Sequence, residues 1–286
     1  MQVSICGSTG LIGRELIDTF SSKGWSFRII SRDALRLPDH EFCEKMIERA
    51  DVVINLAGAP ILKKWTDNYR KEIYDSRILT TRKIAEAIAK AKVKPRVFIS
   101  NSAIGIYDTF AVHNEESNLF ADNFLGKLCR DWEAEALKAA GHTRVILLRT
   151  GVVLSAKGGA LKAAHGPFSF GLGGIIGRGD QPFSWIHIRD LMHIYQTIVE
   201  NENIEGIVNA VAPNPVTNLH FTKTFGKVLQ QITLLKIPVS VLKLIYGEAS
   251  STLIEGQNVI PEKLLRNGFE FEFPTIEKAL LNLYRV

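Results

Sequence analysis

Three glycines near the start of the chain have a spacing that suits phosphate binding. Gly7, Gly10 and Gly13 follow a short apolar run and open an amphipathic helical pattern over residues 12–22. Gly7 permits a tight turn, Gly10 lets the backbone approach a pyrophosphate, and Gly13 allows close packing of helix on strand. The helix start would present free N–H groups to the anion. The pattern predicts a dinucleotide-binding turn, and a purely structural turn is the alternative. The further contacts that we expect in this turn are Thr9, Leu11 and Ile12.

The residues after a second expected strand, 26–30, indicate which dinucleotide is bound. NAD-binding proteins place a carboxylate here, against the ribose 2′-hydroxyl. This chain has Ser31 and Arg32 instead, and a guanidinium beside a hydroxyl suits a 2′-phosphate. We therefore predict NADP(H) as the cofactor, with Arg36 as an additional contact. The alternative is that Arg32 is a solvated loop residue.

Short apolar runs alternate with longer helical patterns through the first two thirds of the chain, as in βαβ units around a parallel sheet. The expected strands are 3–6, 26–30, 52–56, 97–100, 145–148 and 207–210, and the main helices are 12–22, 69–91 and 125–140. This predicts an α/β fold with a Rossmann-type doubly wound parallel sheet. Residues 33–49 are too few for a further βα unit, and the Gly-rich stretch 158–179 is expected to be a loop.

The predicted organisation has two parts. Residues 1–151 form the dinucleotide-binding domain, to which strand 206–211 returns. Residues 152–205 and 212–286 form a small C-terminal α/β lobe that binds substrate. The ends of parallel strands share one crevice, so Leu56, Ala57 and Gly58 are expected under the cofactor, with Ser100 and Ser102 facing the same space.

Composition narrows the classes of protein. The chain has 286 residues, 46% hydrophobic and 23% charged, which is enough to bury a sizeable core. Its net charge of +5 comes from scattered basic residues, so nucleic acid is not an expected partner. Three separated cysteines and the histidine spacing support neither a disulfide framework nor a metal site. No uncharged apolar run is long enough for a membrane span, so we expect a cytoplasmic protein with no membrane contact.

Further segments carry a resemblance to a known family. They include Asn55–Pro60, Ser76-Arg77, Ser100–Ala103, Arg149–Leu154, Gly171–Gly174, Trp185–Ile188, Ala212–Val216 and Gly247-Glu248, in addition to Gly7–Gly13. The chain resembles the extended short-chain dehydrogenase/reductase superfamily and, within it, the NAD(P)-binding epimerase-family proteins of the YfcH type. The resemblance implies a seven-stranded Rossmann sheet, a C-terminal substrate lobe and a cleft between them. It also implies that Ser102 matches the catalytic Ser/Thr. We also predict Thr150, Gly151 and Val152 as cofactor contacts, and Trp185 and His187, on a strand expected to line the substrate side, as substrate contacts.

The chain departs from this superfamily at the catalytic helix. The resemblance implies a Tyr-x-x-x-Lys pair that exchanges a proton with the substrate, but the corresponding positions here are Leu125 and Cys129. In the other register they are Asn123 and Lys127, so the pair is missing in either alignment. Tyr107, just beyond Ser102, is the substitute acid that we predict. Cys129 is a second candidate, and its alternative is a small buried apolar residue. For His187 a structural role is the alternative.

Two functions follow from these residues. The first is an NADP(H)-dependent oxidoreductase or epimerase that acts on a small polar hydroxyl or carbonyl substrate, such as a nucleotide-linked sugar. The second is a non-catalytic NADPH-binding sensor or regulatory protein. A homodimer through helices 69–91 and 125–140 is also expected, because superfamily relatives often pair through the two helices that flank the sheet.

Overall fold

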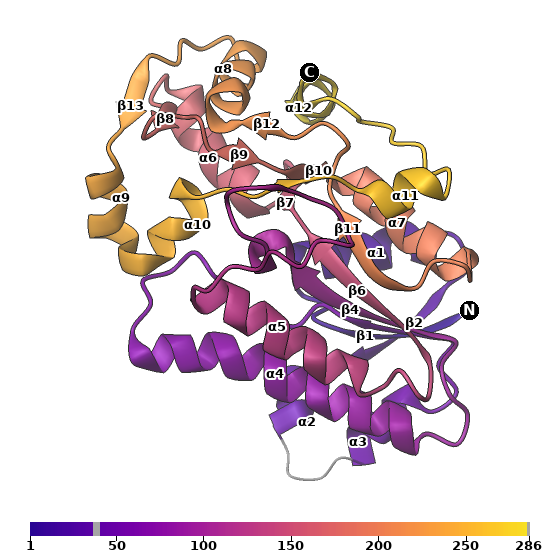
Figure 1. Ribbon diagram of the computed structural model, residues 1–286. Coiled ribbons are helices and arrows are strands. Elements are labelled where there is room, and N and C mark those ends of the chain that lie inside the picture. The colour runs from indigo at the N-terminus through magenta and orange to yellow at the C-terminus, as the bar shows by residue number, and fades with distance from the viewer. Residues whose placement is uncertain (37–40, 285–286) are drawn as a thin grey trace.

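A six-stranded parallel sheet forms the centre of the protein in the computed structural model, which describes residues 1–36 and 41–284 (Figure 1). The strand order is β11-β6-β4-β3-β1-β2, so the chain winds outward in both directions from β1. The doubly wound fold and all six expected strands are confirmed. Their bounds are β1 Gln2–Cys6, β2 Ser26–Ile30, β3 Val52–Asn55, β4 Val97–Ala103, β6 Arg144–Thr150 and β11 Gly206–Ala210.

Helices cover both faces of this sheet. One face packs against α1 and α7, and the other against α3, α4 and α5. The inner strands are mostly apolar because both of their faces are buried, as in β3 with Val52, Val53 and Ile54. The bounds of these helices are α1 Leu11–Ser21, α3 Glu41–Ile47, α4 Asp67–Lys90, α5 Phe124–Leu137 and α7 Ile188–Glu200.

The edge of the sheet differs from what the resemblance implied. Seven strands were expected, but the described residues contribute six to the sheet, and β2 is its edge. The described parts of the connection from β2 to β3 form α2 (Arg32–Arg36) and α3 instead of a strand. The connection is short, as its length predicted, and this leaves the Arg32 end of β2 open to solvent.

One helix of the range predicted for the lobe packs with the sheet. Residues 152–205 were assigned to the lobe, but α7 packs on α1 in the same apolar cluster as the sheet. Leu264 of α11 (Glu262–Arg266) and Phe269 join that cluster too. Apolar side chains on one side of α7, such as Leu191, Tyr195 and Ile198, make this packing favourable.

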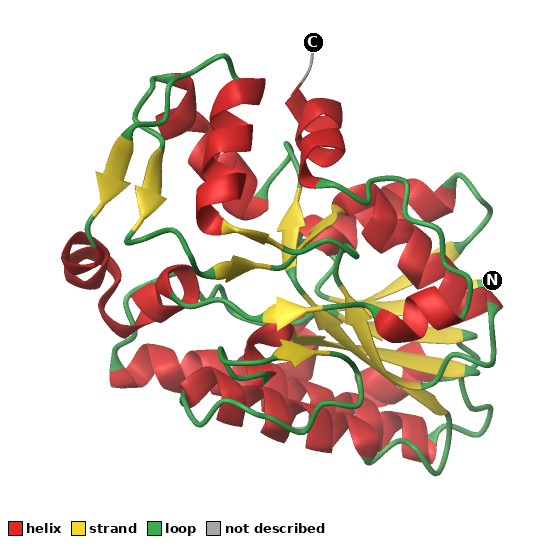
Figure 2. Ribbon diagram, turned by 45° about the horizontal axis from the view of Figure 1, so that its top comes forward, coloured by secondary structure: helices red, strands yellow, loops and turns green. Residues whose placement is uncertain are grey.

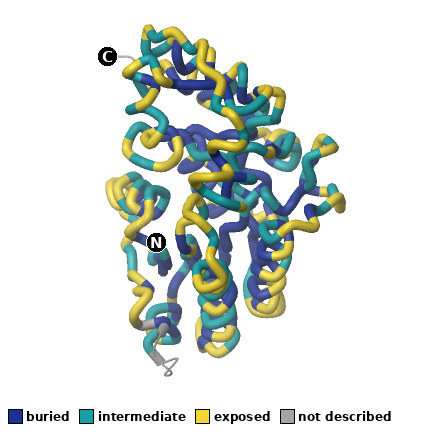
Figure 3. The backbone as a smooth tube through the Cα atoms, turned by 90° about the vertical axis from the view of Figure 1, so that its left-hand side faces the viewer, coloured by how far each residue is buried: buried dark blue, intermediate teal, exposed yellow. Residues whose placement is uncertain are grey.

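The lobe stands beside the main sheet, with its own helices and short strands (Figure 2). It has its own small core around Trp185, Phe225 and Ile276. The Gly-rich stretch expected as a loop contains a helix, α6, since Ala, Leu and Lys between its glycines favour helix. Figure 3 shows buried segments inside both the sheet region and the lobe, and exposed segments along the outer helices. The helices of the lobe are α6 Gly159–Ser169, α8 Asn218–Val228, α9 Val239–Tyr246, η2 Gly247–Ser250, α10 Ser251–Ile254 and α12 Ile276–Tyr284.

Short strands complete the lobe and the loops over the sheet. They pair two by two, as β7–β10, β8–β13, β9–β12 and β5–β14. Their bounds are β5 Val112–His113, β7 Val152–Leu154, β8 Gly174–Ile176, β9 Pro182–Phe183, β10 Trp185–His187, β12 Val216–Thr217, β13 Leu235–Ile237 and β14 Asn258–Val259, and η1 spans Ile104–Ile106.

Candidate functional site

The turn between β1 and α1 has room only for glycine at two positions. Gly7 has a positive φ of 86°, and a Cβ on Gly13 would lie 2.4 Å from the Gly7 carbonyl oxygen. Gly10 is the N-cap of α1 and has no side chain to satisfy the first N–H groups of the helix. The helix therefore starts with backbone donors available to a ligand, which is what a pyrophosphate requires.

The loop after β3 lies directly against this turn. A Cβ on Gly7 would be 2.8 Å from the Leu56 carbonyl carbon, so the two strand ends are in close contact. The Ala57 N–H donates to Asn55 Oδ1 at 3.1 Å, and Asn55 Nδ2 donates to Thr81 Oγ1 at 2.8 Å. These bonds hold the loop to α4 and leave Leu56 and Ala57 half-buried beside the turn.

Arg77 of α4 is a buried charged residue that packs against the loop after β3. It was not predicted from the sequence as a site residue. Its guanidinium fills the space beside Gly58, where a Cβ would lie 2.7 Å from Arg77 Cζ. It donates to the backbone oxygens of Ala59 and Ile73, stacks over Trp132, and forms no ion pair with any described residue. Burial lowers the pKa of Arg77 to about 10. A buried cation without a carboxylate suits an anionic or hydroxyl-rich ligand.

Arg32 lies near the same end of the sheet. Burial raises the pKa of Cys6, the last residue of β1, to about 12, and the Arg32 charge partly opposes this shift. Ser31 and Arg32 are exposed, as a contact with a 2′-phosphate would need. The side chain of Arg36 lies outside the described part of the chain. Thr9 is exposed, and Leu11 and Ile12 are half-buried at the start of α1.

The segment after β6 closes the other side of the turn. A Cβ on Gly151 would be 2.8 Å from the Ser184 carbonyl oxygen, so this position also needs glycine. Thr150 Oγ1 bonds within the sheet, to Leu148 and Asn101, and Val152 begins β7. Next along the chain, a Cβ on Gly158 would be 3.2 Å from Leu11 Cδ1, so the start of α6 meets the start of α1.

Below these loops, five side chains form a buried polar network, which consists of Ser102, Tyr107, Glu133, Arg149 and Asn209. Ser102 Oγ donates to Glu133 Oε1 at 2.6 Å, and Arg149 forms two bonds of 2.7 and 2.8 Å with the same carboxylate. Arg149 also donates to the Tyr107 hydroxyl at 2.8 Å. Glu133 and Arg149 were not predicted from the sequence as site residues, although a charge inside a mostly apolar strand such as β6 is itself a signal.

The Tyr107 hydroxyl is fully used inside this network. It accepts from Arg149 and has Asn209 Oδ1 at 2.9 Å and the Asn114 carbonyl oxygen at 3.0 Å as acceptors for its proton. The side chain has no exposed surface, and burial raises its pKa. The geometry therefore does not bring Tyr107 or Ser102 to a substrate, contrary to the sequence prediction, because both hydroxyls bond inward to protein groups.

The two positions of the missing catalytic pair are apolar in character. Cys129 is 3% exposed, and burial raises the pKa of its thiol to about 12, so it stays protonated. Leu125 lines a cavity described below. Ser100 lies two residues before Ser102 in β4. Its Oγ is buried and has no hydrogen-bond partner among the described residues.

Trp185 and His187 lie inside the lobe instead of on a substrate wall. Trp185 is fully buried in the lobe core, and His187 is 1% exposed and stacks on Phe273. His187 is the N-cap of α7, where its Nδ1 accepts from the Arg189 N–H at 3.1 Å. Burial lowers the pKa of His187 to about 4, so the ring is neutral. The structural alternative for His187 accounts for these contacts, and the expected substrate contact does not.

A cavity of about 600 Å³ opens where α5 meets the lobe. Trp65, Phe124 and Leu125 form its wall on the sheet side, and Val239 of α9 and Ile254 of α10 face them. Arg70 stacks over Trp65 and Phe124 and forms an ion pair with Glu248 of η2, which ties α4 to the lobe. The cavity can therefore enclose a small ligand between an aromatic wall and polar lobe residues, of which Lys243 and Glu255 are exposed.

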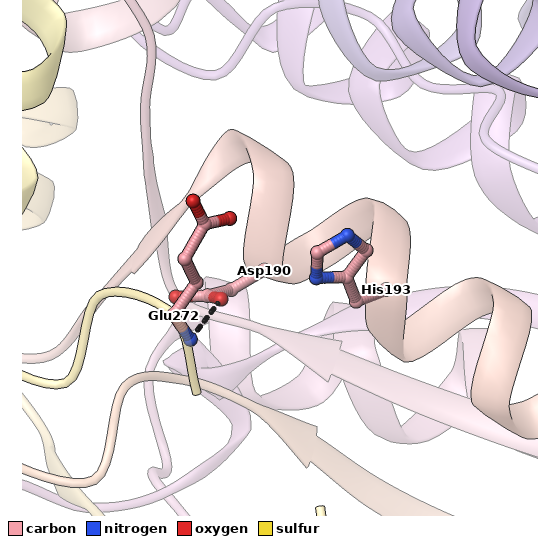
Figure 4. A group of neighbouring side chains, drawn as sticks. All are labelled: Asp190, His193 and Glu272. Carbon is pink, nitrogen blue, oxygen red and sulfur yellow. Dashed lines mark hydrogen bonds between the residues drawn. The ribbon is translucent and has the colours of Figure 1, made fainter. Parts of the chain in front are cut away.

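Asp190, His193 and Glu272 each offer one possible ligand atom, and these atoms lie within 4.8 Å of one another, which is close enough to hold a metal ion (Figure 4). Asp190 already accepts from the N–H groups of Glu272 and Phe273, at 2.8 and 3.0 Å. Glu272 pairs with Arg189 at 3.0 Å. These contacts explain the two carboxylates as a tie between α7 and the C-terminal segment, away from the cavity.

Comparison with known proteins agrees with this geometry. Residues 3–210 match the model of the NAD-dependent epimerase/dehydratase family, and this range contains the turn, the whole sheet and the buried network. The chain belongs to this family. Residues 237–283 match a domain of unknown function, which covers α9 to α12 of the lobe.

Several curated members of the family are similar along their whole length. Human epimerase family protein SDR39U1 is 34% identical over 288 residues, with 98% of each chain covered. Epimerase family protein YfhF of Bacillus subtilis is 35% identical over 298 residues, covering 99% of this chain and 98% of the relative. The family prediction made from the sequence is confirmed.

Solved structures give the same fold. Human SDR39U1, crystallised with NADPH, superposes with a TM-score of 0.90 at 34% identity and 99% coverage of both chains. A nucleoside-diphosphate sugar epimerase of Corynebacterium glutamicum has a TM-score of 0.79 at 32% identity, covering 99% of this chain and 58% of that one. The Rossmann-type fold and an NAD(P)-binding family are thus established.

Membership of this family does not identify the cellular compartment of the protein. Among the described helices, none has the length and apolar character that crossing a bilayer would take. A relative from Arabidopsis thaliana, 34% identical over 302 residues, is named as chloroplastic. The cytoplasmic location therefore stays a prediction.

Proposed function

We propose that the protein binds NADP(H) at the β1–α1 turn and exchanges a hydride with a small carbonyl or hydroxyl substrate in the cavity beside α5. The observation that carries this proposal is the combination of an uncapped helix start at Gly10 with the cavity at Leu125. Bound NADPH would supply the hydride. The protein would supply the phosphate cradle, the charges around it and a partly enclosed substrate space.

The residues present fit the phosphorylated cofactor. Gly7 and Gly13 give the space for the pyrophosphate turn, and Arg32 offers a cation where an NAD-specific protein would need a carboxylate. Arg77 offers a second, buried cation beside Gly58. The presence of NADPH in the human relative's structure supports the same choice.

The proton in this reaction needs a source other than the superfamily pair. Hydride addition to a carbonyl carbon leaves an oxyanion that must take up a proton. Leu125 has no proton to give, and Ser102 donates its own to Glu133. Lys243, on the lobe side of the cavity, and water can give this proton. Under this proposal, the lobe supplies the proton.

A second function is favoured by one observation. The hydroxyls of Ser102 and Tyr107 are both bonded inward, and the positions of the missing pair hold Leu125 and Cys129. This arrangement suits a protein that binds NADPH without turnover and signals cofactor occupancy to a partner. Offering the NADPH-loaded protein a panel of carbonyl compounds and nucleotide sugars separates the two functions. Oxidation with any member supports the enzyme, and silence across the panel supports the sensor.

The cofactor assignment is tested by fluorescence titration with NADPH and NADH. We expect tighter binding of NADPH, and Arg32→Ala should weaken it by about tenfold or more while leaving NADH unchanged, because one charge-assisted contact to the 2′-phosphate is lost. Arg96→Ala is the matched control, since Arg96 precedes β4 at the opposite end of the sheet. Equal affinities for the two nucleotides, or an Arg32→Ala protein that binds NADPH normally, would remove this assignment.

A further inference from the structure

The lobe has an unusual distribution of charge. Residues 136–179 and 206–247 contain no aspartate or glutamate. The second stretch contains four lysines, all of them exposed, at positions 223, 227, 236 and 243. None of these lysines forms an ion pair with a carboxylate among the residues that the structure describes. The positive charge of these two stretches is therefore not balanced by acidic residues of their own, in a chain whose net charge is only +5.

The same segments expose large apolar side chains. Phe170 and Leu234 are each 82% exposed, Leu244 is 81% and Ile232 is 72%. Scattered single apolar residues are normal on a surface, but these belong to a larger set. We call this set the apolar lobe face, and it consists of Phe170, Leu172, Ile232, Leu234, Leu235, Val241, Leu244 and Ile245.

The tertiary structure brings these segments together from different parts of the chain. A Cβ on Gly171 would lie 3.4 Å from Gln231 Oε1, so the end of α6 touches the turn after α8. That turn leads into β13, which pairs with β8, and then through Pro238 into α9. In both ribbon views, β13 and α9 lie at the left-hand edge of the lobe, away from the main sheet (Figures 1 and 2).

We propose that the apolar lobe face docks the protein on a lipid surface that contains anionic headgroups. Exposed leucine, isoleucine and phenylalanine side chains gain free energy by entering the acyl boundary, and lysines beside them attract anionic headgroups. The absence of acidic residues in these segments removes the repulsion that such a surface would otherwise meet. This differs from the expectation of no membrane contact, which rested on missing spans and on charge counted over the whole chain.

A bilayer fits this face better than a protein partner does. Side chains that are about four-fifths exposed project singly from short elements, whereas a protein interface needs a matched surface for each of them. A lipid interface has no fixed shape and accepts projecting side chains wherever they stand. Lys236 lies on the open edge of β13, where a charge discourages strand pairing with another copy.

Docking by this face would place the cavity next to the lipid. Helix α9 contributes Val239 and Lys243 to the cavity wall while Leu244 and Ile245 are exposed on the same helix. One short helix thus connects the two surfaces. The inference does not depend on the proposed function, because it uses only surface residues of the lobe.

The test is sedimentation of the full chain with vesicles of phosphatidylcholine alone and of phosphatidylcholine with 30% phosphatidylglycerol, a composition of roughly the anionic content that polybasic surfaces respond to. We expect binding to the anionic vesicles that falls with added salt. The double variant Leu234→Ser/Leu244→Ser should bind about tenfold more weakly, because two inserted side chains are lost. Lys227→Gln/Lys236→Gln should weaken binding to anionic vesicles by a similar factor, because both lysines are exposed and neither lines the cavity.

Matched controls are available elsewhere on the surface. Phe110→Ser removes a side chain that is 92% exposed before β5, and Lys92→Gln removes an exposed lysine after α4, so neither should change vesicle binding. NADPH binding and the thermal melt should be the same for all variants. No sedimentation with either vesicle, or equal binding by the Leu234/Leu244 variant, overturns the proposal. A dimer in analytical ultracentrifugation that this variant dissociates, without vesicle binding, would instead assign the face to a second copy and overturn it as well.

Discussion

The open turn at β1–α1 and the buried polar network below it treat their polar groups in opposite ways. The turn leaves the first N–H groups of α1 without side-chain caps, and glycines keep its surface free of side chains. In the network, every named polar side chain from Ser102 to Asn209 has a protein partner. Both regions lie at the carboxyl ends of strands of one sheet, the turn after β1 and the network at β4, β6 and β11. One is built to receive a ligand, and the other is built to hold the fold.

This difference separates binding from catalysis in the protein. Ser102, which the resemblance placed in the catalytic role, belongs to the closed region, while the glycines predicted to bind the cofactor, Gly7, Gly10 and Gly13, belong to the open one. A buried ion pair is costly to leave incomplete, so Glu133 and Arg149 must stay together whatever the chain binds. The open turn is free of that demand, and its residues can be judged by ligand affinity alone.

The closed region is broken most strongly by Glu133→Ala. Arg149 is 2% exposed and would be left without its carboxylate, so the free energy of unfolding should fall by about 3–5 kcal/mol. Urea denaturation followed by circular dichroism measures this loss. The double variant Glu133→Met/Arg149→Met removes both charges and should be more stable than the single variant. A stable Glu133→Ala protein would show that the pair does not hold the network.

The open region is tested by Gly13→Ala. The new Cβ would meet backbone atoms at 2.4 and 2.8 Å, so we expect a loss of about 1–3 kcal/mol in stability. NADPH affinity should fall as well, since the turn must widen. Gly166→Ala is the matched control in helix α6, where no atom lies within 4 Å of the new Cβ. It should be neutral or stabilise the protein by up to about 1 kcal/mol. Unchanged NADPH binding in Gly13→Ala would contradict the role of the turn.

Tyr107→Phe sharpens the boundary between the two regions with the smallest effect. It removes one buried hydroxyl, and the stability should fall by about 1–2 kcal/mol while NADPH affinity stays the same. Tyr74→Phe is the control, since the Tyr74 hydroxyl bonds to Asp131 at the surface and its loss should be barely measurable. If Tyr107→Phe abolished turnover of a substrate without a change in stability, Tyr107 would be assigned to the ligand site and not to the buried network.

Much of the architecture follows from short-range patterns. Apolar runs identified the six strands of the sheet, and the spacing of Gly7, Gly10 and Gly13 located the turn, because both signals are contained in a few adjacent residues. The family resemblance was recognisable for the same reason. The packing of α7 was harder to predict, because only the folded chain shows whether its apolar side lies against the sheet or against the lobe.

The roles of single polar residues could not be found in this way. Ser102 and Tyr107 carry hydroxyls at promising positions, but only the fold brings Glu133 and Arg149 against them and uses those hydroxyls up. Arg77 sits in an ordinary amphipathic helix, and its place beside Gly58 depends on how α4 lies across the loop after β3.

The amino-acid sequence by itself determined the doubly wound sheet, the phosphate turn and the missing Tyr-x-x-x-Lys pair, because each is written in local residue types and spacing. Tertiary structure alone decided which polar groups are open to a ligand and which are closed on one another. It also joined the segments of the apolar lobe face, which are about sixty residues apart along the chain. The physical reason is that burial and hydrogen bonding depend on neighbours distant in the chain, and those neighbours exist only once the chain has folded.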